Sequence, residues 1–278
     1  MTKNKWFYRN CLIVACLVAI LILMTQSLGI EKAAADTSGD GYVTYDSNTQ
    51  TWSFGTAEVE KKIQLNASGQ FLLTSFKNKK TNQEYIQGTQ HSDEFQIKTG
   101  NTVYSGSTAG WIYDTHSIST LSQGELELQV TFHNSVLLVT RHYVVYPSTG
   151  AIREWTDFKN ISGSSQYFSS PYMFKQRVMQ NDIDNVDLHY MTGGGNFTGS
   201  GMLKTVPMTT TYARTFDSYD YPEVTTVDGH YEFGLGSYEQ GTAVYDSLFV
   251  FRNHSSSEGI WLSFDYNGHL NPLTTTAT

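Results

Sequence analysis

The sequence predicts an all-β fold, a large antiparallel sandwich. From Thr51 onward the chain consists of short runs rich in Val, Ile, Thr, Tyr, Phe and Trp, bounded by Gly, Asn, Ser and Asp. Several runs alternate between polar and apolar residues, as a sheet with one wet face requires. No long stretch has apolar residues at helical spacing. Together these observations favour one β domain without a helical layer.

The clearest strand is predicted over Glu125–Phe132, which alternates along its whole length. Leu126, Leu128, Val130 and Phe132 are expected to face the core. Two more antiparallel strands, 136–146 and 151–159, follow across short turns. Further strands are predicted at 52–54, 71–76, 95–98, 187–191, 248–251 and 260–266.

Residues 1–35 have the pattern of a secretory signal peptide. Lys3, Lys5 and Arg9 precede an unbroken apolar run, Cys11–Met24, and a small-residue Ala33-x-Ala35 site follows. We therefore expect a secreted, extracellular protein that is cleaved after Ala35. Two alternatives remain open: an uncleaved membrane anchor, and a lipoprotein signal in which Ile13-Val14-Ala15-Cys16 serves as the lipobox.

The rest of the chain divides into two parts. Asp36–Gln50 is polar and Gly-rich, which predicts a flexible mature N-terminus, and residues 51–278 are predicted to form the β domain. The terminal Leu273–Thr278 follows a strand-like run directly, without a closing element. This ending suggests that the chain is a fragment of something longer.

Composition excludes several classes of function. Both cysteines, Cys11 and Cys16, lie within the signal, so the mature chain is not a disulfide scaffold or a thiolate metal site. The whole chain has a formal charge of −8, and removing the mostly basic signal makes the remainder more acidic. Nucleic acid is therefore not an expected partner, because phosphate binding needs clustered Lys and Arg. A neutral sugar is compatible with this charge, and no cofactor is predicted.

Three constellations resemble chemical sites. Asp36-x-Ser38-x-Asp40-Gly41 resembles the opening of a calcium loop, but Ser47 stands where a bidentate Glu should close it. Asp182, Asp184 and Asp187 could be a metal cluster or an acid/base pair, but on a strand Asp187 does not share a face with the other two, and an Asp-rich strand-entry turn is the preferred interpretation. A Gly run, 193–195, follows His189 without the helix that a phosphate cradle needs. None of the three predicts a metal site.

One ordered series of segments begins with Gly124-Glu125-Leu126-Glu127-Leu128 and continues with Leu137–Tyr146 and Ile152–Asn160. The series resembles the N-terminal domain of glycoside hydrolase family 36, the microbial α-galactosidases. Downstream, Asp187–Gly194 and Gly259–Gly268 are similar to later strands of that family. The resemblance spans residues 51–269, and the order of the segments makes it specific.

The resemblance implies a two-sheet β-supersandwich of the galactose-mutarotase type that packs on a (β/α)8 barrel. The catalytic aspartates belong to that barrel, so the resemblance transfers no catalytic residue to this chain. It implies an accessory domain that frames the substrate of a secreted α-galactosidase, with a carbohydrate and the missing barrel as partners. A loop of this domain leans over the sugar pocket in the family, which suggests Asp93 and Trp111 as sugar-facing residues. Packing of Trp111 in the core or at a sheet edge is the alternative to this role, and homo-oligomers are a further open partner class.

Two other functions compete with this one. A stand-alone extracellular carbohydrate-binding or adhesive module needs only aromatic platforms and a few polar groups, and the chain has 18 Tyr, 15 Phe and 5 Trp. A mutarotase-like catalyst would use a His and a carboxylate as acid and base. His189 is its natural candidate, but the sequence places no carboxylate partner beside it.

Overall fold

A computed structural model describes residues 35–86, 92–178, 185–192, 202–208, 213–215, 223–227, 230–236 and 245–263. The chain divides into two units, residues 1–34 and 35–278, and all described residues belong to the second. The expected signal peptide therefore lies outside the described residues. Every regular element that the structure describes over residues 35–263 is a strand, which confirms the all-β prediction. Within the described part of the chain, no helix has the length and apolar character needed to cross a membrane.

The N-terminal part of the domain forms sheet A, an antiparallel meander in the order β1-β2-β3-β4-β5-β6, with β7 paired to β5. Strands that neighbour one another in this sheet follow one another in the chain, so tight turns connect most of them. The strands are β1 (Ala35–Ser38), β2 (Gly41–Asp46), β3 (Thr51–Gly55), β4 (Val59–Leu65), β5 (Phe71–Asn78), β6 (Gln83–Glu84) and β7 (Ser92–Asp93).

A second meander forms sheet C in the order β10-β11-β12-β13. Its strands are β10 (Ile112–Thr120), β11 (Leu126–His133), β12 (Leu137–Val145) and β13 (Ile152–Asn160). The last three correspond to the three consecutive strands expected from the sequence. Their registers run without a shift, from Leu126 opposite Val145 to Leu137 opposite Asn160.

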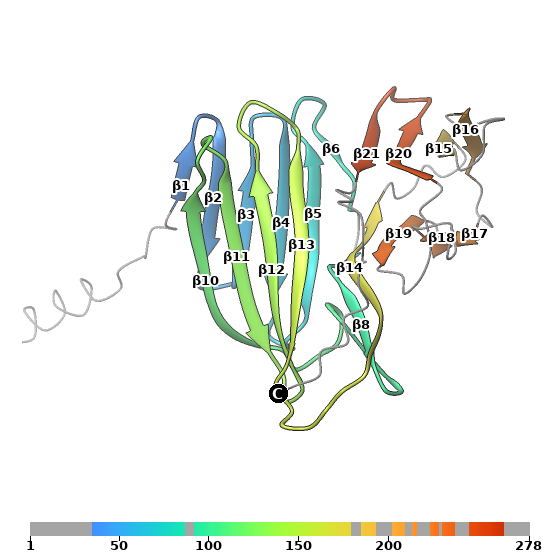
Figure 1. The fold of residues 1–278 in the computed structure, drawn as a ribbon. Coiled ribbons are helices and arrows are strands. Elements are labelled where there is room, and N and C mark those ends of the chain that lie inside the picture. The colour runs from blue at the N-terminus through green and yellow to red at the C-terminus, as the bar shows by residue number, and fades with distance from the viewer. Residues whose placement is uncertain are drawn as a thin grey trace, which may run out of the picture. The chain divides into compact units, whose positions relative to one another are not determined.

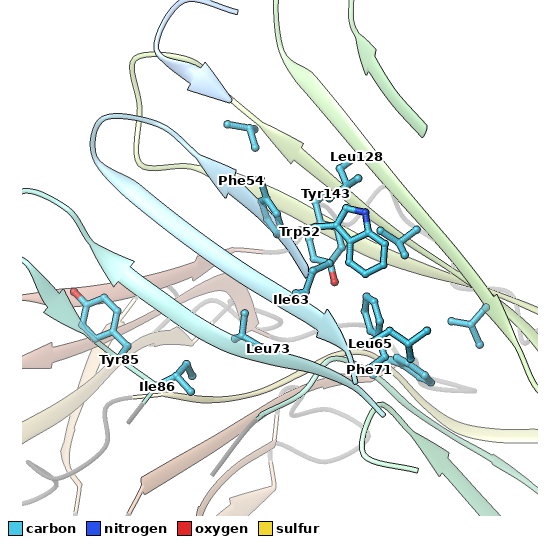
Figure 2. Packing of buried hydrophobic residues seen from close by; sticks show 14 of the residues in the cluster. Trp52, Phe54, Ile63, Leu65, Phe71, Leu73, Tyr85, Ile86, Leu128 and Tyr143 are labelled. Carbon is cyan, nitrogen blue, oxygen red and sulfur yellow. The ribbon is translucent and has the colours of Figure 1, made fainter. Parts of the chain in front are cut away.

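Sheets A and C lie face to face and enclose the main core (Figure 1). The ring of Phe71 stacks on Phe132 with centroids 4.4 Å apart, and Phe54 meets Tyr143 at 4.7 Å. Figure 2 shows Trp52, Phe54 and Ile63 directed from sheet A toward Leu128 and Tyr143. The four residues expected to face inward on β11 are all completely buried. Burial of such side chains contributes about 1.5–3 kcal/mol each, which makes this layer the main source of stability.

Two further antiparallel sheets complete the domain. Sheet B has the order β17-β18-β19-β14-β8-β9 and sheet D the order β16-β15-β20-β21. The strands of sheet B are β8 (Gln96–Thr99), β9 (Thr102–Ser105), β14 (Phe168–Val178), β17 (Ala213–Thr215), β18 (Glu223–Val227) and β19 (His230–Gly236). The strands of sheet D are β15 (Val186–Thr192), β16 (Met202–Pro207), β20 (Tyr245–Asn253) and β21 (Gly259–Ser263).

The expectation of a flexible segment over Asp36–Gln50 is wrong. The segment forms most of β1, all of β2 and the turn after β2, and Val43 is fully buried in the core. Alternation explains this, since Gly41 and Val43 point inward while Tyr42 and Thr44 are only partly exposed. The β domain therefore begins at Ala35 and not at Thr51.

Asp40 holds the turn between β1 and β2 against two other turns. Its carboxylate accepts hydrogen bonds from the backbone N–H groups of Ala57, at 3.0 Å, and Ser148, at 2.5 Å. These bonds lower the pKa of Asp40 below its ordinary value. The residue that resembled a calcium ligand is thus a backbone acceptor in this arrangement.

We expect Asp40→Ala to lower the urea midpoint of unfolding at pH 7, and to lower it less at pH 3. A carboxyl whose pKa is depressed by folding stabilises the protein above its unfolded pKa, and this contribution disappears as the pH falls through the folded value. Urea titrations of the wild type and the variant at both pH values measure the effect. An equal difference at the two pH values would show that the carboxylate charge is irrelevant to this turn.

Candidate functional site: a buried ion network and the predicted sugar-facing loop

Seven polar side chains from five segments meet between the sheets, although the surroundings are apolar. Arg141 and Glu94 are both fully buried, and the guanidinium Nη2 lies 2.7 Å from Glu94 Oε2 and 2.9 Å from Glu154 Oε2. Lys61 of β4 forms a second ion pair with Glu154. The remaining members are Tyr143, Thr156 and Gln176. We call this set the buried ion network.

Cross-strand pairing brings four members of the network together. Arg141 on β12 lies opposite Thr156 on β13, and Tyr143 lies opposite Glu154. Residues paired directly across an antiparallel ladder project from the same face of the sheet. The same register that aligns the two strands therefore aims all four side chains toward sheet A, where Lys61 meets them.

Hydrogen bonds satisfy the network internally. Arg141 Nη1 donates to Thr156 Oγ1 at 2.7 Å, and Arg141 Nε donates to the Tyr143 hydroxyl at 3.1 Å. The Tyr143 hydroxyl in turn donates to Glu94 Oε2 at 2.5 Å. The Gln176 amide donates to Glu94 and Glu154, at 3.1 Å each, while its oxygen accepts from Lys61 at 3.1 Å. Two cations thus balance two carboxylates, which is the condition for burying charge.

Burial and the guanidinium of Arg141, which the two carboxylates share, determine the pKa values within the network. Burial raises the pKa of Glu94, and the nearby guanidinium of Arg141 only partly opposes that effect. Burial alone would lower the pKa of Arg141, but Tyr143 and the two carboxylates outweigh it, so the net pKa is raised. Burial likewise raises the pKa of Tyr143 well above its ordinary value. Arg141 therefore stays charged and Tyr143 stays a hydrogen-bond donor.

This chemistry suits a scaffold better than a catalyst. Every charged group of the network has a partner within it, and Arg141, Glu94 and Tyr143 are sealed from solvent. A general acid or base has to reach a substrate within hydrogen-bonding distance. The network instead fixes how the loop around Glu94, sheet A, sheet C and β14 dock on one another.

The outer face of sheet C carries a second polar cluster, centred on His142. Its Nδ1 lies 3.0 Å from Glu127 Oε1, and its Nε2 lies 3.1 Å from Asp157 Oδ2. The imidazole stacks on Trp155 with centroids 4.4 Å apart and an interplanar angle of 11°, while Arg153 lies over the same indole. Both ring nitrogens of His142 are engaged, and the Trp155 ring is covered by two neighbours. This cluster braces the strands of sheet C.

Asp93, one of the two residues predicted to face a sugar, lies at the end of β7 beside Glu94. Its Oδ1 accepts from the backbone N–H of Ser107 at 2.8 Å, and its Oδ2 lies 3.7 Å from Lys175 Nζ. Only 14% of the side chain is exposed. Asp93 thus anchors the loop after β9, and its sugar-facing role stays a prediction.

Trp111, the other predicted residue, is 3% exposed and packs in the core. Its ring meets Phe95 and Phe132 edge-on at 5.6 and 5.4 Å, and its Nε1 donates to the carbonyl of Ser105 at 2.9 Å. The backbone at Trp111 lies directly against Gly69. A Cβ at position 69 would lie 2.6 Å from the carbonyl oxygen of Trp111, so only glycine permits this approach. The core half of the core-or-edge alternative therefore describes the position of Trp111, and its sugar-facing role stays a prediction.

Tyr85 follows β6 directly and lies upstream of Asp93. Tyr85 is buried and donates from its hydroxyl to Glu258 Oε2 at 3.1 Å, and burial together with that carboxylate raises its pKa to about 12.

The remaining candidates from the sequence are only partly described. Residues 87–91 lie outside the described residues, as do Asp182, Asp184 and the Gly run 193–195. His189 lies on β15, where its Nδ1 is 3.0 Å from Thr205 Oγ1. In the described portion of residues 35–263, no group of three or more His, Asp and Glu side chains is arranged to hold a metal ion.

The buried ion network was not predicted from the sequence. Arg141 occupies an inward position of β12, in a row with Leu137, Val139, Tyr143 and Val145. Lys61 interrupts an inward row on β4 in the same way, between Val59 and Ile63. A charged residue at an apolar position of a strand is the signal that could have revealed a buried charge and its need for a partner.

Comparison with known proteins finds similarity among solved structures only. No family model matches the chain, and no curated protein matches it. Among solved structures, the crystal structure of the GH36 α-galactosidase AgaB from Geobacillus stearothermophilus is similar, with 11% sequence identity and a TM-score of 0.48. The match covers 80% of this chain and 40% of that chain. The chain thus spans less than half the length of that enzyme chain.

Proposed function

We propose that this chain is an accessory β domain of a secreted α-galactosidase-type glycoside hydrolase, which frames the substrate for a catalytic barrel outside residues 1–278. The proposal rests mainly on where three segments lie in the fold, namely 124–128, 137–146 and 152–160, which resemble family 36. They form consecutive strands β11, β12 and β13 in continuous register. Two of them supply Arg141, Tyr143 and Glu154 to the buried ion network.

The network supports a framing role because it uses the motif residues for docking between layers. Its charges are balanced within the domain, so they are not available for proton transfer to a substrate. A rigid domain of this kind suits the support of a neighbouring active site, since supporting residues have to hold catalytic groups within about 0.5 Å.

The test has a genomic and an enzymatic part. The DNA that adjoins the coding sequence of this chain is expected to encode a (β/α)8 barrel with aspartates at strand ends. The purified chain alone is expected not to hydrolyse p-nitrophenyl α-galactoside, whereas its co-expression with the barrel is expected to restore hydrolysis. The absence of a barrel in every frame, or hydrolysis by this chain alone, would overturn the proposal.

A stand-alone carbohydrate-binding module is the second candidate. It is favoured by Trp261, whose side chain is 59% exposed on sheet D, since an exposed indole is the kind of platform on which sugar rings stack. Calorimetry of the full chain against galactosides and polysaccharides separates the two candidates when it is read together with the genomic test. Sugar binding in the absence of any barrel favours the module.

A further inference from the structure

Sheet D has one buried face and one face whose described side chains are partly or largely exposed, which we call the open face. Leu188, Phe249, Phe251 and Ile260 fill the buried face, each with 6% exposure or less. The residues between them in sequence project to the opposite face, because side chains alternate along a strand. Trp261 belongs to that opposite face and is the most exposed Trp among the described residues. Because a single exposed apolar residue is ordinary on a protein surface, the groups that lie beside this indole have to indicate whether it belongs to a binding surface.

The registers place the side chains of the open face in two rows across the four strands. One row runs Thr205, His189, Val250 and Trp261, and the next runs Pro207, Asp187, Arg252 and Gly259. Neighbouring strands lie about 4.8 Å apart, so Trp261 and the β15 residues are separated by roughly 10 Å. This distance matches the length of about two sugar rings.

The ring of Trp261 is left uncovered by its neighbours. Gly259 and Ser263 flank it on the same face of β21, and Val250 lies opposite on β20. All three are small, and a side chain at position 259 would place its Cβ 2.7 Å from the carbonyl oxygen of Phe251. Arg252 is a diagonal neighbour of the indole, within reach of a group bound on it.

Side chains of positive and of negative charge lie beside the indole. Arg252 is exposed, and Asp187 is opposite it in register, with its Oδ2 3.3 Å from Nδ1 of the half-exposed His254. His189 keeps Nδ1 on Thr205, while its Nε2 is buried without a hydrogen-bond partner. An apolar ring face beside balanced charges fits a ligand that is itself apolar on one face and hydroxylated at its rim.

We infer that the open face of sheet D binds a neutral oligosaccharide, with one ring stacked on Trp261 and the hydroxyls of the next ring bound by Arg252 and Asp187. The site stands on the geometry of sheet D, and only the choice of an α-galactoside as the first probe rests on the proposed function. An acidic ligand is disfavoured because Asp187 lies beside Arg252 on this face.

The test is isothermal titration of the purified full chain with raffinose, an α-galactoside, and separately with cellotetraose. Saturable binding of one of them is expected, and Trp261→Ala is expected to weaken it by about tenfold or more, because the indole supplies most of the apolar contact. Arg252→Ala is expected to weaken binding by a smaller factor of roughly three to ten, the range for losing one ordinary hydrogen bond at an exposed position. Trp155→Ala is the matched control, since the Trp155 ring is already covered, and it should leave the affinity unchanged.

Three results would overturn the inference. The first is equal affinity of the wild type and Trp261→Ala, and the second is no binding of either sugar by a folded chain. The third is a Trp261→Ala variant that changes the oligomeric state in light scattering, which would make this face an interface between copies. Each of these is distinguishable from failure of the proposed function, because the genomic search for a barrel does not involve Trp261.

Discussion

Replacing Arg141 by methionine is expected to lower the free energy of unfolding by about 3–5 kcal/mol, since it leaves buried carboxylates without their shared cation. Methionine keeps much of the length and flexibility of the arginine stem, so the loss reports mainly on charge. The deficit is expected to shrink as the pH is lowered. Burial already raises the pKa of Glu94, and removal of the guanidinium raises it further, so the folded variant takes up a proton. Urea unfolding at pH 8 and pH 5 measures both effects.

The control for this prediction is the double variant Arg141→Met/Glu94→Gln. It removes one charge of each sign and leaves Lys61 paired with Glu154, so part of the lost stability should return. If the loss in the double variant equals the sum of the losses in Arg141→Met and Glu94→Gln, the two side chains are not coupled. A loss for Arg141→Met below about 1 kcal/mol would mean that water reaches the network.

Replacing Trp111 by alanine is expected to cost about 3–5 kcal/mol of unfolding free energy, the range for large aromatic side chains in a packed core. The indole contacts Phe95, Tyr104 and Phe132, and its N–H holds the carbonyl of Ser105. Truncation would leave a cavity and an unsatisfied acceptor together. Thermal and urea unfolding of the variant measure the loss.

The matched control for Trp111 is Trp261→Ala, which truncates the same residue type at a largely exposed position. Its effect on stability should stay within about 0.5 kcal/mol. A pattern in which Trp111→Ala is stable but binds galactosides less tightly would contradict the core assignment and would support the sugar-facing role predicted from the sequence.

Much of the fold could be predicted because the alternation of polar and apolar residues along a strand indicates a sheet with one buried face. Glu125–Phe132 differs from the observed β11 by one residue at each end, and all four expected inward residues are buried. Strands that depart from this pattern were missed. β4 carries two consecutive lysines, one of which is buried in the ion network, and β10 is an edge strand with mostly exposed side chains.

The candidate site was less accessible to sequence reasoning, for a physical reason. A buried charge is stabilised by partners that are distant in the chain, as Glu94 is by Arg141 and Lys61 by Gln176, and local patterns do not encode such pairs. Aromatic composition likewise does not separate core rings from exposed ones. Trp111 and Trp261 are the same residue type, and only register and packing place one inside and the other on an open face.

Hydrogen exchange of the full chain tests the central claim most directly, namely that sheets A and C close over the ion network as one sealed unit. Backbone amides of β11 and β12, and of β3 to β5, are expected to exchange slowest and at one common rate, because they open only by global unfolding. Arg141→Met should accelerate both sheets by the same factor. Rapid exchange of either sheet while the other stays protected would contradict the account, since the two layers would then open independently.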